Sequence, residues 1–183
     1  MVIIQTYSIK TAIVLLFVML LNLKCSWFES QEDQLSFSRT PCKENKLKLD
    51  GYYYRSLSFD HIEIYFFFRN GNLLYGTATN LGGLENLESF FSNGKYYEHA
   101  KNDNTFWGIF RITGNTIEYE RWVPADGMGS APIYRYTGTI LNDTTFQMYS
   151  SCRVDGTDEN PYNYVFKFKR FSPKPDSVTK FIP

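Results

Sequence analysis

Few residues of this chain could carry acid–base or nucleophilic chemistry. His61 and His99 are its only imidazoles, and no Gly-x-Ser-x-Gly turn, the usual setting of an activated serine, accompanies them. Two histidines and three cysteines are also little material for a protein-built zinc site. The sequence therefore offers no catalytic residue, metal site or cofactor, and we expect a protein that is not an enzyme.

Arg121 is the charged residue with the most specific interpretation. It follows Ile117 and Tyr119 at the spacing of two that places side chains on one face of a β-strand. Glu118 and Glu120 take the opposite face of the same strand. An arginine on the apolar face of a strand is expected to meet an anion there, because an unpaired buried guanidinium is costly.

The dipeptide Gly114-Asn115 predicts a two-residue turn before this strand. That turn would pair Tyr119 with Phe110, and Arg121 with Gly108, where no side chain competes for space. We therefore expect Arg121 to point into the fold beside Tyr119 and Phe110, ready to receive the carboxylate of an otherwise apolar ligand. An arginine paired with a protein acid, or packed at the end of a barrel, is the alternative.

Two neighbouring groups of charged residues are weaker candidates for a site. The same register sets Glu118 opposite Arg111, which indicates a charge-paired outer face rather than the carboxylate pair of an enzyme. Arg135 and Tyr136 are a second candidate anion site, on a strand whose inner face the pattern leaves ambiguous.

The N-terminal segment predicts export. Residues 11–23 form an apolar run that follows Lys10 and is too short to span a membrane. Cys25 comes directly after it, as in the lipobox of bacterial lipoproteins, although Lys24 stands where that motif has a small residue. We expect residues 1–24 to be a lipoprotein-type signal peptide and Cys25 to be lipidated, with an uncleaved N-terminal anchor as the alternative.

Charge and cysteine content fit an exported protein. Removing the leader leaves 17 basic and 19 acidic residues, a net charge of 17 − 19 = −2, which argues against binding to nucleic acid. If Cys25 carries lipid, Cys42 and Cys152 remain, and an oxidising compartment would join them in a disulfide. Two free thiols are the alternative.

The rest of the chain is organised as short alternating runs separated by turn pairs. Residues 25–46 are polar and indicate a tether, residues 47–171 contain the strands, and residues 172–183 carry three prolines and indicate an extended tail. One helix is predicted over 83–92, as a lid or plug at one end of the fold. The nine predicted strands are 48–56, 61–69, 72–80, 95–99, 105–113, 116–123, 132–141, 145–153 and 162–170.

Strands in hairpin order with no βαβ spacing predict an all-β fold, either an antiparallel up-and-down barrel of eight to nine strands or a sandwich. Hairpin order throughout favours the barrel. The segments Leu49-Asp50-Gly51-Tyr52-Tyr53, 107–122 and 166–177, behind a lipoprotein-like leader, resemble the lipocalin-like (calycin-type) lipoproteins of Gram-negative bacteria. That resemblance implies a small apolar ligand in the barrel and an Arg170 side chain that covers Tyr53.

These observations predict a membrane-anchored barrel in the cell envelope that binds a small hydrophobic molecule, with Arg121, Tyr119 and Phe110 as ligand contacts. We expect a monomer held at the membrane by lipid on Cys25. The alternative is a non-enzymatic interaction or structural module of the envelope whose barrel is filled by its own aromatic side chains. A hollow interior would favour the first function and a packed interior the second.

Overall fold

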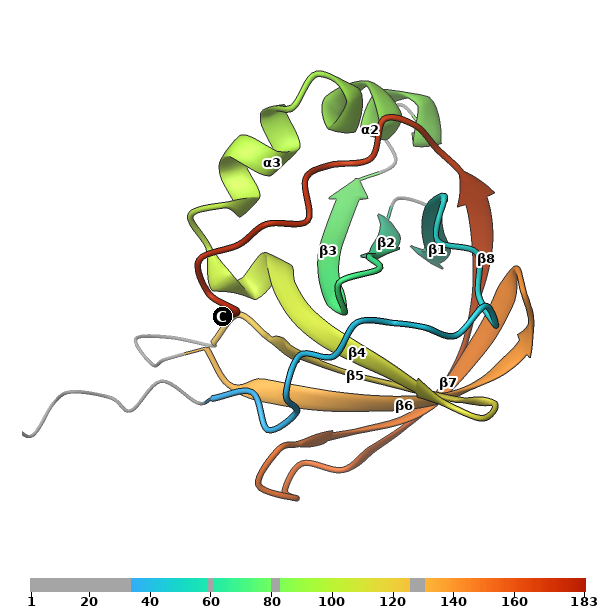
Figure 1. The fold of residues 1–183 in the computed structure, drawn as a ribbon, viewed down its shortest axis with the longest axis vertical. Coiled ribbons are helices and arrows are strands. Elements are labelled where there is room, and N and C mark those ends of the chain that lie inside the picture. Colours follow the sequence, from blue (N-terminus) through green and yellow to red (C-terminus); the bar gives the residue numbers. More distant parts are fainter. Residues whose placement is uncertain (1–33, 59–60, 80–82, 126–130) are drawn as a thin grey trace, which may run out of the picture. The chain divides into compact units, whose positions relative to one another are not determined.

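The computed structural model describes residues 34–58, 61–79, 83–125 and 131–183, and within them eight antiparallel strands close into a barrel. Each strand pairs with the next along the chain, and β8 returns to pair with β1 (Figure 1). This is the predicted all-β up-and-down barrel, and the sandwich alternative is excluded. The strands are β1 Gly51–Ser58, β2 His61–Phe67, β3 Asn72–Thr79, β4 Trp107–Thr113, β5 Thr116–Trp122, β6 Ile133–Asn142, β7 Thr145–Arg153 and β8 Asn160–Arg170.

The hairpin of β4 and β5 has the register that its turn predicts. Gly114 has a φ of 59°, which costs glycine little, and the strands leave the turn with Phe110 opposite Tyr119 and Gly108 opposite Arg121. A Cβ on Gly108 would lie 2.2 Å from the carbonyl oxygen of Glu120 and 2.8 Å from Cβ of Arg121. Glycine is therefore required here for β5 to pack closely against β4.

The described part of the connection from β3 to β4 contains two α-helices and a 3₁₀ turn, and no strand. Helix α2 spans Gly83–Ser92, as predicted, and α3 spans Lys95–Ala100, where we expected a strand over 95–99. A 3₁₀ turn, η1 Asn104–Phe106, leads into β4. The strand prediction was wrong because Tyr96 and Ala100, four residues apart, are the buried positions, which is helical spacing.

The helices cover the outside of the barrel and do not plug its end (Figure 1). Strand β2 is buried from its second residue to its last, so its outward residues need a cover. Phe91 of α2 packs edge-on against Phe66 of β2, with ring centroids 5.0 Å apart. Tyr96 of α3 donates a hydrogen bond to the carbonyl of Tyr75 at 2.5 Å. An apolar core outside the barrel thus lies between β1–β4 and the helices. The C-terminal tail packs into this core.

One end of the barrel, which we call the turn end, carries the β2–β3, β4–β5 and β6–β7 turns, and both flanking segments cross it. In the N-terminal arm, residues 34–50, the amide of Cys42 donates to the carbonyl of Arg69 and the amide of Lys48 to that of Asp143, both at 2.9 Å. In the tail, the Lys174 ammonium donates to the carbonyl of Phe67 at 2.8 Å. These bonds close the turn end with ordered chain.

The predicted disulfide is wrong: Cys42 and Cys152 are both free thiols. Cys42 lies at the turn end, bonded to the β2–β3 turn. Cys152 pairs with Arg135 near the start of β6, at the other end of the barrel. The arm carries its cysteine across the turn end, away from the end at which β7 finishes, and a disulfide needs Cα atoms within about 7 Å.

The contact implied between Arg170 and Tyr53 is also absent from the described residues. Arg170 has 83% of its side chain exposed and pairs with Asp50 at 3.1 Å. Tyr53 points inward and is covered by the rings of Phe146 and Phe168. The predicted leader 1–24 and Cys25 lie outside the described residues. In the part of the chain that is described, no helix is long and apolar enough to cross a membrane.

Candidate ligand pocket in the barrel

The interior of the barrel has two layers of different character. Next to the turn end is the packed layer, where Phe67 has its ring centroid 4.8 Å from that of Phe110 and 5.8 Å from that of Phe146. The N-terminal arm adds Leu47, which is also buried. The side chains of this layer therefore pack against one another. Its members are Leu47, Tyr53, Phe67, Leu73, Phe110, Ile117, Ile140 and Phe146.

A pocket of about 200 Å³ lies in the part of the interior that is farther from the turn end. Leu57 and Tyr164, which are 45% and 37% exposed, lie on its rim, so the pocket opens away from the turn end. Its wall is aromatic, with rings from β3, β5, β6 and β8, and carries three charged side chains. The rings belong to Tyr75, Tyr119, Tyr136, Tyr162, Tyr164 and Phe166, and the charged side chains to Arg55, Glu63 and Arg121.

Arg121 is buried in this wall without an acidic partner. It is 6% exposed, and among the described residues no carboxylate lies within ion-pair distance of its guanidinium. Its Nη1 donates to the carbonyl of Trp122 at 3.2 Å, and its Cζ lies 3.8 Å from the ring centroid of Tyr75. Its Nε is buried and meets no hydrogen-bond acceptor. A cation held in this way favours an incoming anion.

The second arginine of the pocket is already neutralised. Arg55 pairs with Glu63 at 2.5 Å, and the Tyr65 hydroxyl donates to the other oxygen of Glu63 at 2.7 Å. The Arg55 guanidinium also lies 3.6 Å from the ring centroid of Tyr164. The three charged groups therefore sum to one positive charge, and that charge is on Arg121.

Burial controls the ionisation of the pocket. It raises the pKa values of Tyr65 and Tyr119 well above the ordinary value, and the nearby charge of Glu63 adds to the rise. Burial also raises the pKa of Tyr136, against the opposing effect of the Arg121 charge. For Arg121, burial lowers the pKa, but the surrounding tyrosine oxygens outweigh it and the net change is upward. At neutral pH the site therefore presents neutral phenols around a charged guanidinium.

The structure brings together two of the three predicted contacts. Arg121 and Tyr119 line the pocket, whereas Phe110 lies one layer deeper, against Phe67. Of the weaker candidate pair, Tyr136 lines the pocket and Arg135 faces outward, because neighbours on a strand take opposite faces. The sequence reasoning missed Arg55, Glu63, Tyr75, Tyr162 and Tyr164.

The sequence pattern indicates that Arg55 and Glu63 point inward, but it does not show that they pair with each other. Both residues sit at alternating positions with inward aromatic residues, Tyr53 and Tyr65. Their pairing follows only once the β1–β2 register is known. That hairpin has no Asn-Gly or Gly-Asn pair to fix its register, and its turn, residues 59–60, is outside the described part of the chain.

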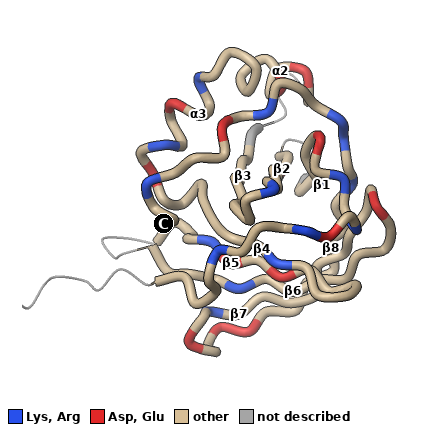
Figure 2. Tube along the Cα trace, viewed as in Figure 1, with Lys and Arg blue, Asp and Glu red and all other residues tan. Residues whose placement is uncertain are grey.

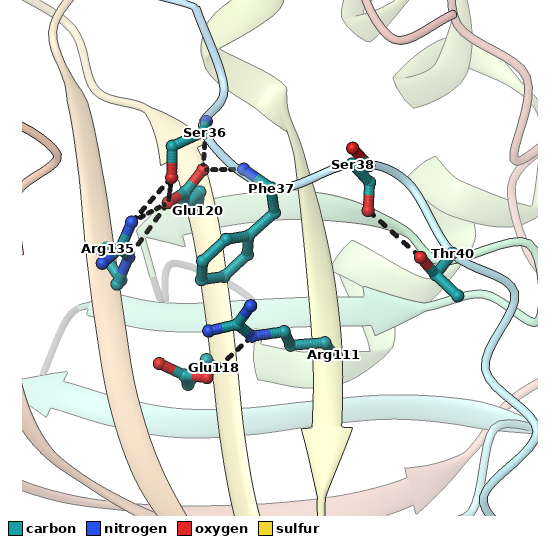
Figure 3. A network of polar contacts seen from close by, with 8 residues as sticks. All are labelled: Ser36, Phe37, Ser38, Thr40, Arg111, Glu118, Glu120 and Arg135. Atoms are coloured by element: carbon teal, nitrogen blue, oxygen red, sulfur yellow. Dashed lines mark hydrogen bonds and ion pairs between the residues drawn. The ribbon is translucent and has the colours of Figure 1, made fainter.

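On the outside of the same strands, the N-terminal arm is held by a polar network (Figure 3). The Glu120 carboxylate is fully buried there and accepts the backbone amides of Ser36 and Phe37 at 2.7 and 3.0 Å. Arg135 pairs with the same carboxylate at 2.8 Å. The Phe37 ring lies under the guanidinium of Arg111, 3.8 Å from its Cζ. Glu120 therefore attaches the arm to the barrel.

The predicted outer charge pair is present beside this network: Arg111 pairs with Glu118 at 2.7 Å. Basic and acidic positions are intermingled along the chain trace in Figure 2. Among the described residues, no group of three or more His, Cys, Asp or Glu side chains is placed to hold a metal ion.

Comparisons of the chain with known protein families, with curated proteins and with solved structures gave no match. The geometry of the pocket is therefore the basis for the proposed function.

Proposed function

We propose that this chain is a binding protein whose barrel holds a small hydrophobic molecule that carries a carboxylate. One observation carries the proposal: Arg121 is buried and charged in the wall of an open, mostly aromatic pocket, and no acidic partner for it lies among the described residues. Binding sites commonly combine apolar walls with a few placed polar groups. A carboxylate would supply the acceptors that the guanidinium lacks.

The proposal extends to a lipocalin-like lipoprotein of the cell envelope. It is supported by the eight-stranded up-and-down barrel with a pocket inside it. The apolar run 11–23 followed by Cys25 supports export and lipid anchoring. The test is fractionation: Cys25→Ser should move the protein from the membrane fraction to the soluble fraction. Unchanged partition with the leader still attached, by mass, would favour an uncleaved anchor.

The binding test uses saturated carboxylates of graded chain length, titrated by calorimetry. Wild type should bind at least one of them, and Arg121→Leu should weaken that binding by about thirtyfold or more, the loss of about 2–3 kcal/mol for a charged hydrogen bond. Arg170→Leu is the matched control, since Arg170 is exposed and outside the barrel. Equal affinities for wild type and Arg121→Leu would contradict the role of Arg121.

A second function is favoured by the packed layer. Half of the interior is filled by the protein's own rings, and a cavity of about 200 Å³ is smaller than the ~300–1,000 Å³ usual for drug-sized ligands. An interaction or structural module of the envelope would need no ligand. Native mass spectrometry of protein purified from its source separates the two functions, because a co-purifying small molecule is expected only from the binding protein.

A further inference from the structure

The polar groups of the pocket are divided into a satisfied set and an unsatisfied set. Glu63 accepts from both Arg55 and Tyr65, so these three groups are occupied with one another. Arg121 belongs to the other set, with the hydroxyls of Tyr136, Tyr162 and Tyr164, and of these three tyrosines it is Tyr136 whose ring contacts Arg121. The ring of Tyr136 lies 5.6 Å from the Arg121 guanidinium carbon. The Tyr136 hydroxyl makes no hydrogen bond to any described residue. It is not fully buried, since it is not among the fully buried polar atoms that lack a partner. The Arg121 guanidinium and the Tyr136 ring therefore lie near each other in the pocket wall.

The size of the pocket limits what these groups can hold. A cavity of about 150 Å³ accepts a benzene ring, and the pocket has about 200 Å³. Beneath it the packed layer begins: Phe166 of the pocket floor is stacked on Phe146, with ring centroids 4.9 Å apart. A long acyl chain could be enclosed only by displacing these buried rings, and otherwise part of it would protrude through the open end of the pocket. The pocket therefore fits one ring and one carboxylate.

The wall of the pocket favours a flat ring over a saturated group. Tyr119 and Tyr136 are stacked, with centroids 4.7 Å apart and planes 17° from parallel, and Tyr162 continues the stack beyond Tyr136 at 6.1 Å. Leu57 and Met148 are the aliphatic side chains among the eleven residues that line the pocket. Aromatic pairs gain stabilisation beyond that of area burial alone, so an aromatic ligand uses this wall better than an aliphatic one of the same size.

We propose that the pocket selects a compact aromatic monocarboxylate, of the size of benzoate, and that Arg121 and Tyr136 together hold its carboxylate. This inference rests on the proposed function, because it specifies the class of ligand for the same pocket. The guanidinium supplies charge and a charge-assisted hydrogen bond, and the Tyr136 hydroxyl supplies a second hydrogen bond. The ring lies among the tyrosine rings above Phe166.

The test compares four probes by calorimetry on the full chain: benzoate, cyclohexanecarboxylate, octanoate and benzamide. Benzoate should bind at least about fivefold more tightly than cyclohexanecarboxylate, from the ring–ring contribution. It should also bind more tightly than octanoate, which is too long, and than benzamide, which lacks the charge. Tyr136→Phe should weaken benzoate binding by about three- to tenfold, the worth of one hydrogen bond.

The controls keep this inference separate from the proposed function. Tyr149→Phe removes a hydroxyl from an exposed tyrosine that does not line the pocket, and it should leave benzoate affinity unchanged. If octanoate or cyclohexanecarboxylate binds as tightly as benzoate and depends on Arg121, the aromatic class is overturned and the proposed function stands. If benzoate binds equally to wild type and Tyr136→Phe, the role of Tyr136 is overturned. If none of the carboxylates binds, both proposals fall.

Discussion

The two layers inside this barrel are built from the same strands with the same alternation, yet one is full and the other is hollow. In the packed layer, Phe67, Phe110 and Phe146 contact one another, and the one phenol there, on Tyr53, donates to the carbonyl of Asp143. The pocket layer has an arginine whose Nε meets no acceptor among the described residues, on a strand that needs a glycine opposite. The first layer stabilises the fold. A buried cation held in this way costs the second layer some stability.

Alkaline pH should produce the largest change. Burial raises the pKa values of Tyr52, Tyr53 and Tyr96 outside the pocket, and it also affects four tyrosines in or beside the pocket. Tyr65, Tyr75, Tyr119 and Tyr136 surround the pocket, and burial raises the pKa of each. A raised pKa contributes stability that is complete below the unfolded value of about 10 and falls as pH rises above it. Each such tyrosine should lower the free energy of unfolding by up to about 1.4 kcal/mol per pH unit.

Urea unfolding between about pH 8 and about pH 11 measures this loss. Tyr119→Phe should make the decline with pH less steep, because one buried phenol no longer titrates. An unfolding free energy that stays constant over this range would contradict the burial of these hydroxyls.

Truncation in the packed layer should have the next largest effect. Phe67 is 1% exposed and contacts five aromatic rings. Phe67→Ala should therefore lower the free energy of unfolding by about 3–5 kcal/mol, from lost burial and the cavity left behind. Urea denaturation measures the change. A loss below about 1 kcal/mol would mean that this layer collapses around the gap and is less tightly packed than its ring contacts indicate.

Truncation in the pocket layer should have a smaller effect of the opposite sign. Arg121→Leu removes a buried charge that has no ion-pair partner within the part of the chain that the structure describes, so the free energy of unfolding should rise by about 1 kcal/mol. The same urea experiment provides the measurement, and the two variants together compare the layers directly. A clear loss of stability would show instead that the contacts of the guanidinium with Trp122 and Tyr75 hold the barrel together.

Reduction should have the smallest effect, which is none. Cys42 lies at the packed end of the barrel and Cys152 near the open end, and neither is bridged. Adding a reductant should leave the unfolding midpoint unchanged, and alkylation of the unfolded, unreduced protein should label both thiols. A midpoint that falls on reduction would indicate a covalent link between the two ends.

The sequence predicted those parts of the fold that short turns determine. The Gly114-Asn115 turn determines the β4–β5 register. That register predicted that Arg121 points inward beside Tyr119. No comparable turn fixed the β1–β2 register, and the Arg55–Glu63 pair was missed for that reason. Local pattern is sufficient where a turn determines which residues face each other.

The rest depended on contacts between distant segments. Residues 95–99 have the aromatic content of a strand, but helix α3 forms because Tyr96 fits over Gly76, whose missing side chain leaves space for the tyrosine ring. The position of Phe110 below the pocket depends on how Phe67 and its neighbours fill the interior. Neither relation can be seen in a window of neighbouring residues.

The attachment of the N-terminal arm to Glu120 also sets a length scale. A tether that was free from Cys25 to residue 46 would have 46 − 25 = 21 residues and a maximum reach of about 70–75 Å. Because Ser36 is fixed to the barrel by its amide and hydroxyl, only 36 − 25 = 11 residues separate it from Cys25, and the maximum reach is about 36–40 Å. A barrel anchored at Cys25 would therefore stay within roughly one bilayer thickness of the lipid surface.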